Sequence, residues 1–342
     1  MKINDFKKTL VAQIKAMKAG EKFLNLYLKS QPGVGKSSII HQTAAEYSMP
    51  VIDVRGAQLD PVDLRGLPYV KEGVMVFSDA GFLPRESRDG KFGILFLDEV
   101  AQSPLAVQNA MLQLVLDRRL GDYQVPEGWL IVAAGNRDID RAGAGRITTA
   151  LGNRVVHIEL NVDHDEWHNW GVAHGMRADI LAFIKRRSNL LSVFNPKEEI
   201  NATPRSWEFA NVILNQGHEL DIEAEMLEGA VGKGPATEFM GFRKCWKDLP
   251  NIEKICAGSD EKMSDKPDVQ YATTISLSLV INGKNCANVL KWMQSKLPAE
   301  FTAMMIKDAQ ARLGRDEFVK EIARNPEFSK WAVKSGQKVM AA

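Results

Sequence analysis

The chain has 342 residues, of which 45% are hydrophobic and 25% are charged. This composition is typical of a folded protein with two or three domains. The 44 Lys and Arg residues nearly balance the 43 Asp and Glu residues. The net charge therefore gives no indication of a nucleic acid or an anionic membrane as partner.

The three cysteines, Cys245, Cys256 and Cys286, lie far apart in the sequence. An odd number at this spacing fits neither a disulfide framework nor a zinc site, and it favours a reducing compartment. No apolar run reaches the length of a membrane span, and the first residues lack the apolar core of a signal peptide. We therefore expect a cytoplasmic protein without a membrane segment.

Residues 1–22 have apolar side chains at helical spacing, which predicts a helix that ends near Gly20. The next segment, 23–40, is predicted to form a strand, a tight loop and a helix. Leu24, Leu26 and Leu28 alternate as in a buried strand, and a loop of small residues follows. This context, together with the Gly-Lys-Ser that opens the helix, is typical of a phosphate-binding loop rather than of an incidental turn.

The loop residues suit phosphate for separate physical reasons. Gly33 and Gly35 allow the backbone to turn so that several N–H groups point into one concavity, at a helix N-terminus with partial positive charge. Lys36 can neutralise the β- and γ-phosphates, and the Ser37 hydroxyl can bind Mg²⁺. Ser30 replaces the first Gly of the pattern, and we expect little effect at this strand exit. The predicted nucleotide-binding residues are Gln31, Pro32, Gly33, Val34, Gly35, Lys36, Ser37 and Ser38.

Two further strands follow the loop. Residues 51–54 are predicted to form a short strand, and residues 70–78 a hairpin around Glu72 and Gly73. The apolar run 92–97 predicts a strand buried on both faces, as in a parallel sheet. It ends in Asp98, which suits Mg²⁺ coordination, and Glu99, which suits a general base that orients water. Alone, these could equally be surface acids, but the preceding loop favours the catalytic interpretation.

The next elements repeat this organisation. A helix is predicted for residues 103–116, a second hairpin for residues 120–128, and a buried strand for residues 129–136. That strand ends in Asn136, whose amide could hold the attacking water or contact the γ-phosphate. An Asn at a strand end is also a common turn residue.

The pattern becomes helical after a last strand. Arg154 stands directly before the predicted strand 155–160, and helices are predicted from residue 162 onward. Thr203 and Pro204 are typical of a helix start, and Arg205 follows them. His164 and His168 have the spacing of a zinc-protease motif, but Asp165 stands where that motif has Glu, so we favour a helix start with acidic residues. Residues 219–342 are predicted to be mostly helical, with a polar linker at 258–267.

The order of these motifs resembles an AAA+ ATPase of the MoxR type. The motifs are Ser-Gln-Pro-Gly-Val-Gly-Lys-Ser, Leu-Phe-Leu-Asp-Glu, Ala-Ala-Gly-Asn, Leu-Gly-Asn-Arg and Thr-Pro-Arg-Ser-Trp. The resemblance extends to about residue 215, and beyond that it rests on helical character alone. It implies an α/β fold: a P-loop AAA+ core with a five-stranded parallel sheet between helices, then a helical lid and a further mostly helical region.

The resemblance also implies roles for individual residues. Lys36 and Ser37 correspond to the Walker A pair, and Asp98 and Glu99 correspond to the Walker B pair. Asn136 would be sensor 1, Arg154 the arginine finger and Arg205 sensor 2. Arg141 and Arg146 are neighbouring candidates for the finger. The two predicted hairpins would be the two insertions that this clade carries.

For the whole chain, we expect a core over residues 1–160, a lid over 161–235 and a helical region over 236–342. The resemblance implies a Mg²⁺-dependent ATPase that forms a hexameric ring and remodels protein complexes, possible clients being proteins with a von Willebrand factor A domain. Two alternatives stay open: a motor that translocates nucleic acid, which the even charge balance disfavours, and an assembly scaffold that hydrolyses ATP slowly, which Glu99 disfavours.

Overall fold

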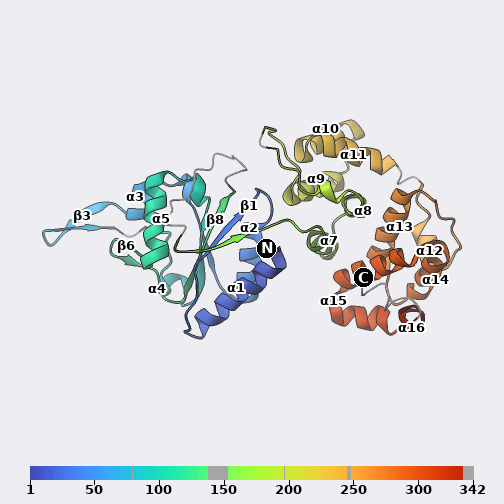
Figure 1. Cartoon of the computed structure of the whole chain (residues 1–342), viewed down its shortest axis with the longest axis horizontal. Helices are drawn as coiled ribbons and strands as arrows, with labels where there is room; N and C mark the ends of the chain where they lie inside the picture. The colour runs from blue at the N-terminus through green and yellow to red at the C-terminus, as the bar shows by residue number, and fades with distance from the viewer. Residues whose placement is uncertain (79, 138–152, 196, 245–247, 334–342) are drawn as a thin grey trace. The chain divides into compact units, whose positions relative to one another are not determined.

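The computed structural model describes residues 1–78, 80–137, 153–195, 197–244 and 248–333, and it divides into two compact units (Figure 1). Unit 1 comprises residues 1–162 together with 194–199. Unit 2 comprises residues 163–193 and 200–342. The first boundary falls two residues after the end of the predicted core, whereas the predicted division between lid and C-terminal region stays a prediction.

Unit 1 is built on a five-stranded sheet in which neighbouring strands are all parallel. The strands, in chain order, are β1 (Leu26–Ser30), β2 (Val51–Arg55), β5 (Gly93–Asp98), β8 (Trp129–Asn136) and β9 (Val156–Glu159). Their spatial order is β2-β5-β8-β1-β9, so β1 is flanked by β8 and β9. The predicted five-stranded parallel sheet is therefore confirmed, and all five strand ends lie along one edge.

Helices cover both faces of this sheet, as the blue and green ribbons of Figure 1 show. Leu26 and Leu28 on β1 belong to the core cluster that includes helices α1 (Ile3–Lys18) and α2 (Lys36–Glu46). Tyr27, between them, belongs to the cluster on the opposite face with helix α5 (Leu105–Asp117). Successive strand residues point to opposite faces, so the alternation along β1 fixes which side each helix covers.

Two small hairpins stand outside the main sheet, as predicted. The first pairs β3 (Pro68–Lys71) with β4 (Val74–Phe77), and the second pairs β6 (Arg119–Leu120) with β7 (Tyr123–Gln124). Short helical segments flank them in the chain: η1 (Gly56–Gln58), α3 (Pro61–Arg65), α4 (Glu86–Asp89) and η2 (Val100–Gln102). In Figure 1 the β3–β4 hairpin projects from the body of unit 1.

Unit 2 is helical, apart from one isolated bridge between Val193 and Ala202 among the residues described there. Its first part contains α7 (His164–Ala173), α8 (Ala178–Arg186), η4 (Ser188–Leu190), α9 (Pro204–Gln216), α10 (Leu220–Val231) and α11 (Lys233–Arg243). Its second part contains α12 (Ile252–Ala257), α13 (Pro267–Val280), α14 (Cys286–Lys296), α15 (Ala299–Phe318), the π-helical η6 (Val319–Ala323) and α16 (Pro326–Trp331). Every helix in the described ranges is too short or too polar to cross a membrane.

Aromatic side chains and a buried His–Asp pair contribute to the packing of unit 2. The ring of Phe183 packs against Trp207 and Phe239, with ring centroids 5.6 and 5.2 Å apart. His168 on α7 lies 3.0 Å from a carboxylate oxygen of Asp308 on α15, and both residues are buried. These helices come from the two parts of unit 2, so a buried polar contact joins regions that the sequence suggested as separate domains.

The histidine pair does not form part of a metal cluster. Asp163 caps α7 by accepting a hydrogen bond from the Glu166 amide, which is the predicted helix start. No cluster of three or more His, Cys, Asp or Glu side chains suitable for a metal ion occurs among the described residues.

The stretch predicted as a polar linker is irregular but attached to the core of unit 2. Residues between α12 and α13 contact α14, because the Trp292 indole donates a 2.9 Å hydrogen bond to the Glu261 carbonyl and Lys296 pairs with Asp260 at 2.7 Å. Trp292 and Trp331 are buried, while Trp246 lies outside the described residues.

Substitution of Gly93 by Ala should destabilise unit 1, because a Cβ at this position would lie 2.5 Å from the Trp129 ring. Trp129 is fully buried and cannot move without disturbing the core, so we expect a loss of about 1–3 kcal/mol in the free energy of unfolding. Gly81→Ala is the matched control, since nothing lies within 4 Å of its added methyl group. Equal denaturant midpoints for the two variants would contradict this account.

Candidate nucleotide-binding site

The loop between β1 and α2 has the backbone geometry that its glycines predict. Gly33 and Gly35 have φ angles of 73° and 103°, which side chains on L-residues disfavour. Gly35 is the N-cap of α2, and no side chain caps this helix. The first turn also contains no acidic residue. The positive end of the helix is therefore available to an anion bound in the loop.

Lys36 lies at the centre of the loop and is only 9% exposed. Its ammonium group donates to Ser30 Oγ at 3.0 Å, to the Gln31 carbonyl at 3.3 Å and to Asn136 Oδ1 at 3.3 Å. None of these three oxygens carries a formal charge. A buried cation at the start of a helix is suited to a phosphate group.

Ser30 has a larger role than the sequence pattern suggested. Its side chain is fully buried, and its hydroxyl donates to the Gln31 carbonyl while accepting from Lys36. The residue that replaces the usual glycine therefore helps to position the lysine.

Ser37 and Asp98 form a second contact at the same edge. The Ser37 hydroxyl donates a 3.2 Å hydrogen bond to Asp98 Oδ2, and the Glu99 amide donates to Asp98 Oδ1 at 2.8 Å. A hydroxyl and a carboxylate are the hard oxygen ligands that Mg²⁺ prefers, and Mg²⁺ commonly takes its other ligands from substrate phosphates and water. The two side chains therefore fit a Mg²⁺ ion that is shared with a nucleotide.

Glu99 follows the end of β5 in an unusual backbone conformation. Its φ and ψ angles are 57° and 30°, in the left-handed region that non-glycine residues adopt rarely. Its carbonyl accepts hydrogen bonds from the Ser103 hydroxyl at 3.0 Å and from the Gln102 amide at 3.0 Å. The short helix η2 thus holds this residue in place, and backbone strain of this kind is concentrated at functional sites.

Sheet register explains why Asn136 reaches the loop. β1 and β8 are parallel, and Ser30 is paired with Asn136. Both residues are therefore at the carboxyl edge, and the Asn136 amide oxygen contacts Lys36 as described above. The structure brings together Lys36, Ser37, Asp98 and Asn136 through direct hydrogen bonds, with Glu99 next to Asp98 in the chain.

The predicted arginines lie elsewhere. Arg154 is exposed and precedes β9, whose first residue is paired with Leu26 at the start of β1. Arg154 therefore lies at the edge of the sheet where the strands begin, which we call the amino edge. The phosphate loop lies at the opposite edge, and the five residues of β1 separate the two by about 16 Å, at ~3.3 Å per residue. Arg205 is exposed in the first turn of α9 in unit 2, where Thr203 and Ser206 form a capping box. The alternative finger candidates Arg141 and Arg146 lie outside the described residues.

Sequence reasoning missed two side chains beside the site. His41 Nε2 lies 3.8 Å from Asp53 Oδ2, joining α2 to β2. Burial, and secondly the charge of Asp98, raise the pKa of the Asp53 carboxyl above its ordinary value. Ser37 and His41 are one helical turn apart, so their spacing was a usable signal that both face the strand ends.

Asp53 also lines a pocket at the end of β2. The cavity volume is about 460 Å³, and its lining consists of Asp53, Val54, Arg55, Gln58, Leu59 and Phe82. Arg55 is paired with Asp98 in the sheet register, so the pocket is adjacent to the candidate magnesium ligand.

The comparison with protein families agrees with this geometry. Residues 26–158 match the model of the family described as "ATPase family associated with various cellular activities (AAA)". The match begins with β1 and ends within β9, so the matched segment contains four complete strands of the sheet, most of β9 and every hydrogen-bonded site residue. No curated protein matches the chain.

Several solved structures resemble the chain at low identity. A RuvB mutant from Thermotoga maritima has 17% identity and a TM-score of 0.41, with 80% of this chain and 81% of that chain covered. NtrX from Brucella abortus has 14% identity and a TM-score of 0.39, with 89% and 68% covered. Hsp104 in a complex with ATPγS and casein has 16% identity and a TM-score of 0.38, with 70% and 44% covered. At these values, the matches carry no argument about function.

Substitution of Asp53 by Asn should raise the melting temperature near neutral pH. The pKa of Asp53 is higher in the folded protein than in the unfolded chain, so the ionised carboxylate reduces the free energy of unfolding. This loss of stability disappears as the pH falls through the folded pKa and the carboxyl becomes protonated. We therefore expect the variant to melt higher than the unmodified protein at about pH 7.5 and to lose this advantage at about pH 4. A gain that is the same at both pH values would contradict the electrostatic cause.

Proposed function

We propose that this protein is an ATP-hydrolysing AAA+ ring of the MoxR type that remodels protein complexes. The observation that carries the proposal is the joint placement of Lys36 and Asn136, and of Ser37 and Asp98, at the carboxyl edge of one parallel sheet. Ligands of open α/β sheets bind at this edge. The family match supports ATP as the nucleotide, because its description names ATPases.

Each side chain of the site has a distinct task in this proposal. The uncapped start of α2 and the Lys36 ammonium bind the phosphates, and Ser37 and Asp98 orient the metal ion. Mg²⁺, when bound, neutralises charge that develops on the phosphate oxygens. Glu99 accepts a proton from the attacking water, and Asn136 positions that water or the γ-phosphate. Positioning and charge neutralisation account for most catalysis of phosphoryl transfer.

Replacement of Glu99 by Gln should separate binding from hydrolysis. The amide has the same shape but cannot accept a proton, so we expect near-normal ATP binding and hydrolysis that is at least about a hundredfold slower. Fluorescent ATP titration and a phosphate-release assay measure the two quantities.

Asp98→Asn is the comparison for that experiment, since it removes a metal ligand rather than the base and should weaken Mg²⁺-dependent ATP binding. Equal losses of binding in the two variants would contradict this division of roles. Wild-type protein that binds ATP but does not hydrolyse it would favour the scaffold alternative.

We further propose that the site is completed by Arg154 from a neighbouring copy in a ring, with Arg205 approaching the nucleotide from the lid. The support for the first part is the position of Arg154 at the amino edge, about 16 Å from its own phosphate loop across β1. An extended arginine side chain is too short for that distance. A second copy packed against the carboxyl edge would receive the guanidinium instead.

Mixing experiments test this arrangement. Arg154→Ala and Lys36→Ala proteins should each be inactive, because an arginine finger contributes about 10³–10⁵ in rate and Lys36 binds the phosphates. A mixture of the two should regain part of the ATPase rate, since some interfaces then contain an intact loop and an intact arginine. A parallel mixture of Arg146→Ala and Lys36→Ala proteins is the control for the competing assignment of Arg146 as the arginine finger. Mixtures that never recover would show that Arg154 does not act between copies.

Our proposal of a protein client is based on the order of the sequence motifs. That order supports a protein client, which could contain a von Willebrand factor A domain, and a hexameric ring in a reducing cytoplasm. ATPase rates with DNA, RNA and protein clients distinguish this proposal from a nucleic-acid motor. A rate that rises with DNA or RNA alone would favour the motor.

A further inference from the structure

The β3–β4 hairpin exposes an unusual number of apolar side chains. Val70, Val74 and Met75 are 74%, 63% and 63% exposed, and Leu67, Tyr69 and Phe77 are also exposed. Register pairs Val70 with Met75 and Lys71 with Val74, so these two pairs lie on opposite faces of the hairpin. Both faces are therefore apolar, and neither contributes a residue to the core clusters of unit 1.

The hairpin is closed firmly at both of its ends. Glu72 and Gly73 have φ angles of 54° and 78°, as in the tight two-residue turns that match strand twist. At the base, Leu67 and Ser78 exchange hydrogen bonds of 2.9 Å. A Cβ at Gly66 would lie 1.6 Å from the Ser78 carbonyl oxygen, so only glycine permits this close approach. A two-stranded hairpin without a core is only marginally stable alone, and these contacts compensate.

The hairpin also presents open strand edges. Among the described residues, β3 and β4 pair only with each other. Pro68 interrupts the edge of β3 because proline lacks an N–H group, whereas β4 contains no proline. An open edge between apolar faces is suited to a further extended strand, which would add backbone hydrogen bonds and apolar contacts. A nucleic acid is disfavoured because Lys71 and Glu72, at the tip, carry opposite charges.

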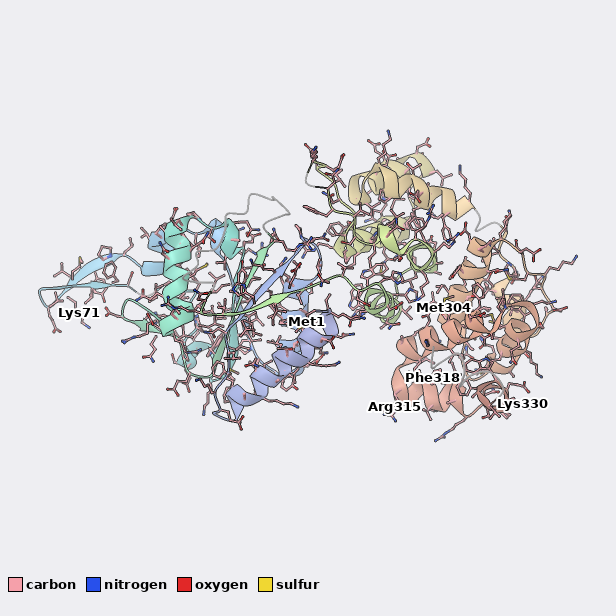
Figure 2. The ribbon with its side chains drawn as sticks, viewed as in Figure 1. Met1, Lys71, Met304, Arg315, Phe318 and Lys330 are labelled. Atoms are coloured by element: carbon pink, nitrogen blue, oxygen red, sulfur yellow. The ribbon has the colours of Figure 1, made fainter. Side chains whose placement is uncertain are left out.

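Size argues for a transient partner. A stable contact between two folded copies needs about 20–30 residues on each side, and the hairpin supplies far fewer. A short contact of this kind suits a client that binds and is released. Figure 2 labels Lys71 at the end of the hairpin that projects from unit 1, where an incoming chain meets no other element of that unit.

We propose that the β3–β4 hairpin binds an extended apolar segment of the client polypeptide, which adds as a strand along β4. This inference rests on the proposed remodelling function, because it names the chemistry of the client. It makes the hairpin the element that selects segments of alternating apolar residues, while the nucleotide site supplies the energy for remodelling.

Peptide binding tests the proposal on the full chain. The probe is a fluorescein-labelled peptide of alternating Val and Thr residues with Lys at both ends, and the comparison peptide has Ser in place of Val. Fluorescence anisotropy without nucleotide measures binding separately from hydrolysis. We expect the wild-type protein to prefer the Val peptide.

The test variant combines Val70→Thr, Val74→Thr and Met75→Thr, because threonine keeps strand propensity while it removes apolar surface. We expect it to bind the Val peptide at least about tenfold more weakly, with an unchanged basal ATPase rate. Leu105→Thr is the matched control, since Leu105 is 63% exposed on α5 and should retain binding. Near-UV circular dichroism confirms folding.

Three outcomes would overturn the inference: no preference of the wild-type protein for the Val peptide, equal binding by the triple variant, or a triple variant that changes only the oligomeric state in sedimentation. The last would identify a second copy as the occupant. Peptide binding without ATPase activity would instead refute the proposed function and leave the hairpin site standing.

Discussion

The parallel arrangement of β1 between β8 and β9 is the constraint on which the site depends. Because all five strands run in the same direction, each strand delivers its last residue to the same edge. Ser30, Asp98 and Asn136 are the last residues of β1, β5 and β8. Side chains of β8 alternate between the core clusters on the two faces of the sheet, so a shift by one residue would exchange these contacts and remove Asn136 from Lys36. Core packing and the site are therefore specified together.

The same constraint explains the charge balance of the edge. Asp53 and Asp98 lie on adjacent strands, and burial, followed by the charge of Asp98, raises the pKa of the Asp53 carboxyl. Arg55 and His41 lower this pKa, but less than burial and Asp98 raise it. A bound divalent cation would act in the same direction as Arg55 and His41 and with greater charge. The site is therefore electrostatically prepared for a cation next to Asp98.

Much of unit 1 could be predicted from the sequence because its signals are local. Continuous apolar runs gave β5 and β8, and the spacing of glycines with Lys36 gave the loop. The Glu72-Gly73 turn identified the hairpin because both residues must adopt positive φ. β8 has the predicted limits, and the limits of β2, β5 and β9 differ by one residue from those predicted. The prediction for Leu24 was wrong, because β1 begins at Leu26 and Leu24 is 50% exposed. Pairing with neighbours rather than propensity decides where a strand begins and ends.

Contacts between distant segments were harder to predict. The contact of His41 with Asp53 joins α2 to β2, the next element in the chain, and the spacing of Ser37 and His41 shows only that His41 faces the strand ends, not which carboxylate it meets. The hydrogen bond from Lys36 made Ser30 part of the site, although the motif suggested a neutral replacement. Likewise, the pairing of His168 with Asp308 spans 140 positions and joins a helix of the predicted lid to a helix of the predicted C-terminal region.

Strand direction also limits what one copy of the protein can do. A residue that precedes a strand in this sheet lies at the amino edge, whereas a residue that ends one lies at the carboxyl edge. Arg55 ends β2 opposite Asp98, while Arg154 precedes β9. The two arginines of the same unit are therefore held at opposite edges, and rotation of a side chain cannot exchange them. Of these two arginines, Arg55 is the one placed to balance the carboxylates at the ends of β2 and β5, and this is why the role proposed for Arg154 involves a second copy.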